Sequence, residues 1–536
     1  MTEQRGASGA VLVTLAAAAF LMTLDSSVMN VSMATVATDV HTSITGIQTA
    51  ITLYTLVMAT LMITGGKVGS MIGRRRAFAI GCVIYGCGSL VTGLATSLPV
   101  LLLGWSLLEG MGAALIMPAT VALVATNFAP AERPRTYGLI AAAGAIAVAA
   151  GPLLGGAATT YGSWRWVFFG EVAVVGLILV LSRRVVDAPV TARVQLDVVG
   201  TLLSVLGLGL AVFGVLRTSE WGWISQRPGA PAPLGLSASF WLILAGGLIV
   251  WMFILWQQHR IARSREPLMR PSMFANPQLT GGLVMLLFQF MLQAGVFFII
   301  PLFLSVVLEL SAIETGLRVM PLSIALLVSA IGVPRIWPQT SPRRIVRVGV
   351  LLLLGGIVAL MSGIELDANA AVVGVPLLLV GLGMGALSSQ LGAVTVSAVP
   401  TSESGEVGGL QNTATNLGAS IGTALAGSIL IGALSASLLT GIQQNPAVPD
   451  SVKSTATVTL APGAPFLSDS DLRARMDDAG VDPTVTDAVV AENRRARIQG
   501  LDAALGSLAV LAVVALILTG RVPRRSTMDT VDPTTE

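Results

Sequence analysis

Fourteen stretches of this chain are apolar and long enough to cross a lipid bilayer, and no other feature constrains the fold as strongly. The hydrocarbon core, roughly 30 Å thick, needs about 20 mainly apolar residues per helix. The composition agrees, because 54% of the residues are hydrophobic and only 11% are charged. The predicted spans are 10–32, 46–67, 77–95, 98–122, 137–160, 166–182, 197–217, 237–257, 279–305, 314–333, 346–364, 371–395, 408–436 and 500–520. The sequence therefore predicts an all-α integral membrane protein.

The basic residues predict which side of the membrane each connection faces. With the N-terminus in the cytoplasm, 21 of the 31 Lys and Arg residues fall in cytoplasmic segments and 4 in short outer connections. The other 6 lie in the long outer loop 437–499, and long loops are largely exempt from the positive-inside rule. We therefore expect a multi-pass protein of the inner (cytoplasmic) membrane with both termini in the cytoplasm.

The chain divides into two halves that resemble each other. Residues 1–190 and 271–536 each carry six predicted spans, and residues 191–270 carry an inserted pair. A short basic loop, 73–76 in one half and 341–347 in the other, follows the second span of each half. Internal repeats that meet at a central site are common in secondary transporters.

The outer loop 437–499 between the last two spans admits two interpretations. It is either a solvated connector or a folded lid or binding module. Asp482 followed by Pro483 is typical of a helix start, and that helix is predicted to run through Ala488 and Arg495 into the last span.

Several function classes are excluded by the same residues. His41 and His259 are the only histidines and both fall in loops, so we expect neither a histidine-based catalytic triad nor a zinc site, and no enzyme activity. Cys82 and Cys87 share one predicted span, and we expect no disulfide. The basic residues follow topology and form no nucleic-acid-binding patch. The chain has no Walker motif, so the expected energy source is an ion gradient without a cofactor.

A Gly/Arg-rich loop, 65–76, connects the second and third spans. Glycines allow two helix ends to approach, and arginines can meet carboxylates, helix C-termini or anionic lipid. The loop closely resembles the signature of the major facilitator superfamily, in which it acts as a conformational switch. The residues that carry this resemblance are Gly66, Gly69, Ser70, Gly73, Arg74 and Arg75. The superfamily normally has an aspartate where this chain has Ser70, so a latch built on that charge is not expected here.

Two further segments extend the resemblance over most of the chain. The fifth span resembles the superfamily's antiporter motif through Gly138, Gly151, Pro152 and Gly155, with Ala147 in place of one glycine. Small residues also serve generic helix packing, which remains the alternative. Residues 24–31 and 408–419 are similar to motifs of the fourteen-helix drug–proton antiporters. The resemblance implies the major facilitator fold, with two six-helix halves plus an inserted helix pair.

Three carboxylates fall inside predicted spans, where charges are costly and usually functional: Asp25, Glu109 and Glu171. Burial disfavours the charged form of a carboxylate, so such a group can take up and release a proton, and when ionised it attracts a cation. The superfamily usually has arginine where this chain has Ser106 and glutamine where it has Glu109. We expect the three residues to couple proton movement to substrate binding, with Asp25 and Glu109 facing a central cavity and Glu171 nearer the periphery. A structural role in hydrogen bonding is the alternative for each.

By the same resemblance, spans 1, 4, 9 and 12 line the cavity. Aromatic and amide side chains at helical spacing suit flat cationic molecules, although such residues also often face lipid. The residues predicted to line the cavity are Asn30, Gln289, Gln293, Phe290, Ser388 and Gln390.

These features predict a proton-coupled antiporter that exports lipophilic, cationic drugs or toxic compounds by alternating access. Its partners would be the small-molecule substrate, protons and membrane lipid, with no nucleic acid and no metal, and the protein is expected to be a monomer. Two alternatives remain open. One is export of an endogenous lipid, a siderophore or a self-made antibiotic, and the other is a non-transporting sensor or scaffold that uses the outer loop.

Ser70→Asp is expected to be tolerated, because it restores the residue that the superfamily normally has in this loop. The measurement is membrane expression together with efflux of a fluorescent substrate. Loss of either in the variant contradicts the expectation.

Overall fold

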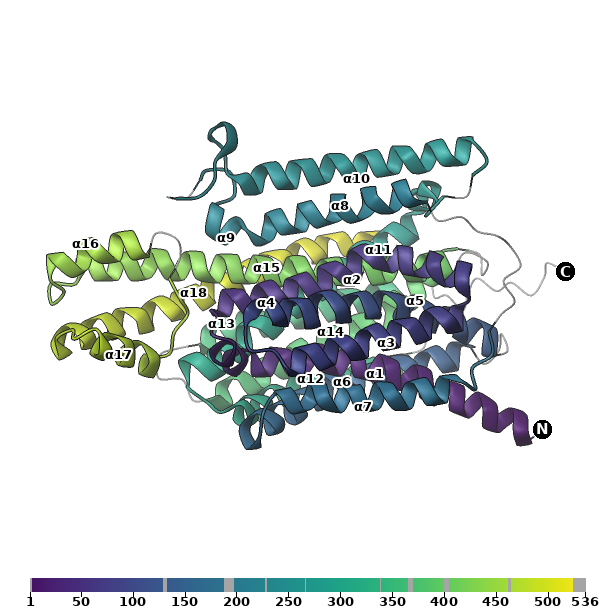
Figure 1. Ribbon diagram of the computed structural model, residues 1–536, viewed down its shortest axis with the longest axis horizontal. Coiled ribbons are helices and arrows are strands. Elements are labelled where there is room, and N and C mark those ends of the chain that lie inside the picture. The colour runs from purple at the N-terminus through teal and green to yellow at the C-terminus, as the bar shows by residue number, and fades with distance from the viewer. Residues whose placement is uncertain are drawn as a thin grey trace.

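The computed structural model describes residues 2–128, 133–187, 197–226, 229–265, 267–337, 339–364, 370–399, 404–460 and 464–523. All regular structure in these ranges is helical, and the long helices run side by side in one bundle (Figure 1). Thirteen of the helices are long and apolar enough to cross a membrane. The remaining predicted span falls on the helix Arg133–Tyr161, of which Ile146–Tyr161 forms a shorter apolar stretch.

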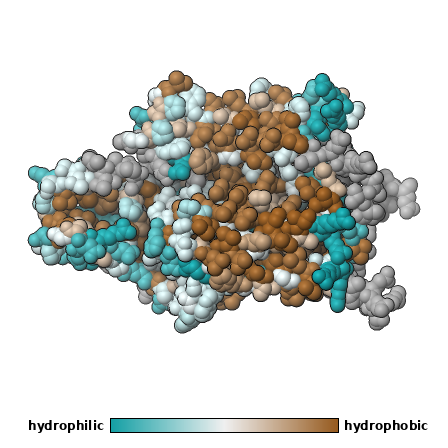
Figure 2. All heavy atoms as spheres, viewed as in Figure 1, coloured by the Kyte–Doolittle hydropathy of each residue, from teal (hydrophilic) through white to brown (hydrophobic). Residues whose placement is uncertain are grey.

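Apolar side chains gather over the middle of the bundle, and hydrophilic side chains lie towards its two ends (Figure 2). This is the surface expected of helices that pass through hydrocarbon and end in water. The prediction of an all-α integral membrane fold is therefore confirmed.

The first six predicted spans form the N-terminal half. The fourth is built from three consecutive segments, and the middle one, η1, is a π-helix with one extra residue in its turn. The helices are α1 (Thr2–Asp39), α2 (Ile44–Ile72), α3 (Arg74–Gly93), α4 (Leu98–Leu101), η1 (Leu102–Glu109), α5 (Gly110–Asn127), α6 (Arg133–Tyr161) and α7 (Arg165–Ser182).

The inserted pair lies along one side of the bundle, at the top of Figure 1. It consists of α8 (Val198–Leu216) and α10 (Ala238–Ala262), joined through α9 (Thr218–Trp221) and η2 (Pro233–Gly235). Gly207 and Gly246 let the two backbones approach, because a Cβ atom at either would lie within 3 Å of the facing helix. Asp197 caps α8 and accepts hydrogen bonds from Trp256 and Gln257 of α10.

The C-terminal half begins with η3 (Pro271–Ala275). Its other elements are α11 (Pro277–Leu302), η4 (Phe303–Val307), α12 (Ala312–Ile336), α13 (Pro342–Gly363), η5 (Ala370–Val373), α14 (Gly374–Val396), α15 (Ser404–Gln444), α16 (Asp450–Thr459), α17 (Asp469–Asp478), α18 (Pro483–Leu518) and η7 (Thr519–Arg521).

The two halves meet tightly at the end of the bundle where α1 finishes and α2 begins. Between α2 and α15, the Gln48 amide donates to the carbonyls of Thr423 and Ala424 at 3.1 and 3.2 Å. Between α6 and α12, the backbone N–H of Ile313 donates to the Thr160 hydroxyl at 3.0 Å. These two seams join the halves at the end remote from the start of α1.

The segment 437–499, which was predicted to be an outer loop, forms a folded helical unit in its described part. We call this unit, made of the end of α15, α16, α17 and the start of α18, the outer subdomain. It projects beyond the bundle at the left of Figure 1. Its small core is built from buried apolar residues, namely Leu438, Ile442, Val448, Ala464, Phe466, Val485 and Val489. The prediction that one helix continues from Pro483 into the last span is confirmed by α18. A purely solvated connector does not describe this segment.

A buried arginine ties the outer subdomain to the bundle. Arg497 is fully buried, and its guanidinium donates to the carbonyls of Val306 at 3.0 Å and Leu467 at 2.9 Å. It also pairs with Asp469 at the start of α17. One side chain thus joins α18, α17 and the outer end of η4.

Arg497→Ala is expected to loosen the outer subdomain, because breaking a buried ion pair costs about 3–5 kcal/mol. Hydrogen exchange of α16 and α17 should speed up strongly in this variant. The control is Arg473→Ala, whose half-exposed pair with Asp487 is worth at most about 1 kcal/mol. Equal exchange in the two variants would contradict this account of Arg497.

Candidate functional site

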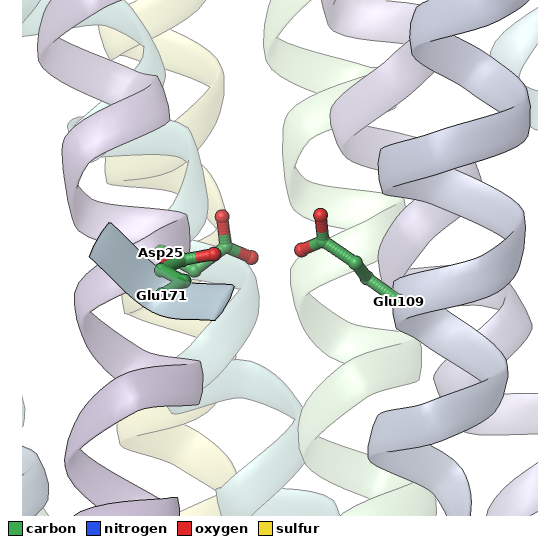
Figure 3. A group of neighbouring side chains, drawn as sticks. All are labelled: Asp25, Glu109 and Glu171. Carbon is green, nitrogen blue, oxygen red and sulfur yellow. The ribbon is translucent and has the colours of Figure 1, made fainter. Parts of the chain in front are cut away.

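Three buried carboxylates converge inside the N-terminal half. Asp25 comes from the middle of α1, Glu109 from the end of η1 and Glu171 from the first two turns of α7. One oxygen from each lies within 4.8 Å of the others, and the residues are 0%, 0% and 2% exposed. Figure 3 shows Glu109 pointing across towards the other two. Each of these residues was predicted separately from the sequence, and the structure brings them together. We call the three residues the carboxylate cluster.

Helix α3 supplies hydroxyl partners to the carboxylate cluster. Ser89 donates to Glu171 Oε2 at 3.0 Å, and Thr92 donates to Glu109 Oε1 at 3.1 Å. Tyr85, one turn before Ser89, is fully buried. These three residues were not predicted from the sequence. Their spacing of four and then three residues, which places polar groups on one face of an apolar helix, was the signal that could have found them.

A glycine on α3 makes room for Glu109. A Cβ atom at Gly88 would lie 2.6 Å from Glu109 Cγ and 2.8 Å from the Glu109 backbone nitrogen. In the same π-helix, the Ser106 hydroxyl donates to the Ala50 carbonyl of α2 at 2.8 Å. The position where the superfamily usually has arginine therefore holds a helix–helix hydrogen bond.

A stacked aromatic pair stands beside Asp25. The Trp105 indole N–H donates to both Asp25 oxygens, at 2.9 Å to Oδ1 and 2.8 Å to Oδ2. The Trp105 ring is stacked on that of Tyr54 from α2, with centroids 5.1 Å apart and planes 5° from parallel. Because the indole can only donate, this contact favours an oxygen with free lone pairs on Asp25.

The carboxylate cluster has no built-in counter-charge. In the described part of the chain, none of the three carboxylates forms an ion pair with Lys, Arg or His. Glu109 Oε2 and Glu171 Oε1 are buried and have no hydrogen-bond partner among the described residues. Ionising all three carboxylates at once is costly, because burial and mutual repulsion both oppose it. The arrangement is suited to binding and releasing a positive charge.

A cavity of about 620 Å³ lies between the two halves. Four of the six residues predicted to line it do so: Asn30, Phe290, Gln293 and Ser388. The other two do not. Gln289 is buried and donates to Ser388 at 2.6 Å, and Gln390 donates to Ser389 at 3.3 Å. The remaining lining residues are apolar or neutral polar side chains and a glycine from both halves: Met22, Thr23, Ser26, Ser27, Ile51, Tyr54, Thr55, Met58, Trp105, Met117, Gly144, Val148, Ala294, Phe297, Leu326, Ala330, Ile331, Pro334, Ser389, Asn412, Thr415, Asn416, Ala419 and Thr423.

The expectation that Asp25 and Glu109 face this cavity is wrong, because neither is among its lining residues. Five residues of α1 line the cavity, namely Met22, Thr23, Ser26, Ser27 and Asn30, whereas Asp25 is fully buried and turned to the flank. In η1 it is Trp105 that reaches the cavity. The expectation that Glu171 is peripheral is also wrong, because it is 2% exposed and part of the cluster.

The backbone of the Gly/Arg-rich loop is hydrogen-bonded to a carboxylate from elsewhere in the chain. Gly73 has φ of +99°, a conformation that L side chains rarely adopt, and it joins α2 directly to α3. Asp187, after α7, accepts hydrogen bonds from the backbone N–H groups of Arg74 and Arg75, both at 3.1 Å. The Arg74 guanidinium donates to Thr126 at 3.0 Å.

Two of the predicted loop glycines, Gly66 and Gly69, have ordinary surroundings. A Cβ atom at Gly66 would lie 3.5 Å from Pro118, and one at Gly69 would lie 3.7 Å from Ala77. The side chain of Ser70 and the surroundings of Gly138 lie outside the described residues.

The small residues of α6 let it pack against both halves. A Cβ atom at Gly151 would lie 2.2 Å from the Ser27 hydroxyl oxygen, and one at Gly155 would lie 2.9 Å from Val28 of α1. The Pro152 carbonyl would lie 2.1 Å from a Cβ atom at Gly316 of α12. This segment therefore forms part of the seam between the halves.

Comparison with known proteins shows which family this chain resembles. The sequence profile described as Major Facilitator Superfamily matches residues 15–423. The chain is 32% identical over 434 residues to the puromycin resistance protein of Streptomyces alboniger, covering 80% of this chain and 82% of that protein. It is 29% identical to the tetracenomycin C resistance and export protein of Streptomyces glaucescens, covering 80% and 76%. Among solved structures, an inward-facing bacterial homologue of the human lysosomal transporter Spinster aligns with a TM-score of 0.58 at 16% identity, covering 98% and 99% of the two chains, and shows the same fold.

Gly88→Ala is expected to displace Glu109, because the added methyl meets both the side chain and the backbone of that residue. Overpacking of this kind costs roughly 1–3 kcal/mol. The measurement is the thermal stability of the purified protein in detergent. The control is Gly176→Ala on α7, where a Cβ atom meets nothing within 4 Å, and stability should not fall. Equal stability of the two variants would contradict the close fit at Gly88.

Proposed function

The chain belongs to the Major Facilitator Superfamily, and on that premise we propose that it is a proton-coupled antiporter. It exports lipophilic, cationic drugs or toxic compounds across the inner membrane by alternating access. The observation that carries the proposal is the carboxylate cluster of Asp25, Glu109 and Glu171, which lies beside an uncharged cavity and lacks a counter-charge among the described residues.

Exchange of a proton for a cationic substrate follows from the charge of the carboxylate cluster. When the carboxylates are ionised, their field favours a cation in the adjoining cavity. When protons neutralise them, that attraction is lost and the cation leaves. A proton and a cation therefore compete energetically, and a ligand that stabilises one conformation over the other shifts the equilibrium between inward-open and outward-open states.

The cavity supports a lipophilic substrate. Its lining combines aromatic rings, methionines and amide or hydroxyl groups, which is typical of sites for organic molecules of moderate size. The relatives point the same way, since one is named for puromycin resistance and another for tetracenomycin C resistance and export. The proposed energy source is the proton gradient, without a cofactor. We propose a monomer in contact with membrane lipid, with both termini in the cytoplasm.

Export of a self-made antibiotic is the second candidate. It uses the same cavity and the same proton cycle, and the name of the tetracenomycin C exporter favours it over an endogenous lipid or a siderophore. A producer strain that accumulates its own antibiotic after deletion of this protein would identify that substrate.

Ethidium efflux from cells that lack their own pumps tests the proposal. Wild type is expected to expel ethidium, and a protonophore should stop it. Glu109→Gln and Asp25→Asn remove an ionisable group from the cluster and should lower efflux by roughly tenfold or more.

The matched control is Asp502→Asn, which changes another carboxylate within a span, on α18 and outside the cavity lining. Its efflux should stay within about twofold of wild type. Efflux that persists in Glu109→Gln and Asp25→Asn, or that ignores the protonophore, would refute proton coupling through the cluster.

A further inference from the structure

We infer that the proton site and the drug site of this protein are separate and are coupled across one aromatic partition, the stacked rings of Tyr54 and Trp105. The cationic, planar part of the substrate rests against the cavity side of this partition. The indole N–H of Trp105 transmits its presence to Asp25. This inference rests on the proposed function and deepens it.

The partition reaches both sites. Tyr54 and Trp105 both line the cavity, and Trp105 donates to Asp25, whereas Asp25, Glu109 and Glu171 are absent from the lining. Trp105, with Tyr54 stacked on it, therefore extends from the cavity to the carboxylate cluster. A substrate can sense the carboxylates without touching them.

Burial keeps water away from the partition. Tyr54 and Trp105 are only 2% and 1% exposed, and the three carboxylates are 0% to 2% exposed, so little water contacts either side of the partition. Charges on its two sides are then screened by aromatic rings and not by water, and their interaction is correspondingly strong. A cation in the cavity favours ionised carboxylates, and ionised carboxylates favour the cation.

The chemistry of the cavity lining also supports the inference. No described residue of the cavity lining carries a charge, so we expect a cation to be recognised by ring faces and by the carboxylates behind them. Tryptophan and tyrosine are the aromatic residues that attract cations best. The C-terminal half contributes Phe290 and Phe297 from α11 to the lining, which suits a flat, aromatic cation over a compact one.

Besides contacting the substrate, the partition positions the proton site through the hydrogen bond from Trp105 to Asp25. The indole donates to both oxygens of the carboxylate, so any movement of the ring against a bound substrate changes the hydrogen bonding of Asp25. The stack on Tyr54 holds the ring in the orientation that this bond requires. Trp105 thus acts as a positioning residue for the proton site.

The test is proton release on ethidium binding to the purified, full-length protein in weak buffer with a pH-sensitive dye. Wild type should release about one proton per ethidium bound near neutral pH. Trp105→Phe keeps a stacked ring but loses the N–H donor. It should bind ethidium within about threefold of wild type and release well under half as many protons.

Trp164→Phe is the matched control. Trp164 is also 1% exposed and also donates its indole N–H to an aspartate, Asp39 at 3.0 Å, but it does not line the cavity. Its proton release should equal that of wild type. If Trp105→Phe releases protons like wild type, or if Trp164→Phe loses release to the same extent, the inference is wrong.

A second variant tests the substrate subsite. Tyr54→Leu should weaken ethidium binding by about tenfold, while binding of the uncharged dye N-phenyl-1-naphthylamine should change by less than about threefold. Equal losses for both ligands would overturn the subsite. Failure of the inference is distinguishable from failure of the proposed function. In the first case efflux still requires Glu109 and the proton gradient, and in the second wild type neither binds ethidium nor releases protons.

Discussion

The structure of the N-terminal half depends on holding three carboxylates together in an apolar bundle without a basic residue beside them. Each is restrained by a neutral donor, namely the hydroxyls of Ser89 and Thr92 and the indole of Trp105. Neutral donors leave the charge of the cluster free to vary, whereas an arginine would fix it. The π-helix of η1 serves the same end, because within one turn it directs Trp105 to the cavity and Glu109 to the cluster.

Small residues determine how close the two halves come. A Cβ atom at Gly156 of α6 would lie 2.6 Å from the Ala312 carbonyl oxygen, and one at Gly316 of α12 would lie 2.1 Å from the Pro152 carbonyl oxygen. Along α2 and α15 the contact is made by Gln48, which bonds to backbone carbonyls. Both seams include hydrogen bonds in which a backbone group of one half meets a side chain of the other. Such contacts suit a molecule in which the halves move relative to each other.

The cost of burying charge made Asp25, Glu109 and Glu171 predictable from the sequence. Their convergence was not, because it depends on the rotation of α1 and α7 about their axes and on the extra residue in η1, which no periodicity revealed. The same limit explains why only some of the cavity-lining residues were predicted correctly. Phe290 and Gln293 share a face with Phe297, whereas Gln289 lies one residue round the helix and reaches Ser388 instead. The core of the outer subdomain was beyond prediction, because its apolar residues are scattered among polar ones.

Helix α15 has a mechanical consequence. It is 41 residues long and carries cavity-lining residues such as Asn416 in its first half and part of the subdomain core near its C-terminal end. At 1.5 Å per residue it is about 60 Å long, so a tilt of roughly 10° about its N-terminal end would move its C-terminal end by about 10 Å. A small rotation of α15 at the cavity would therefore become a much larger displacement of the outer subdomain, which acts as the far end of a lever.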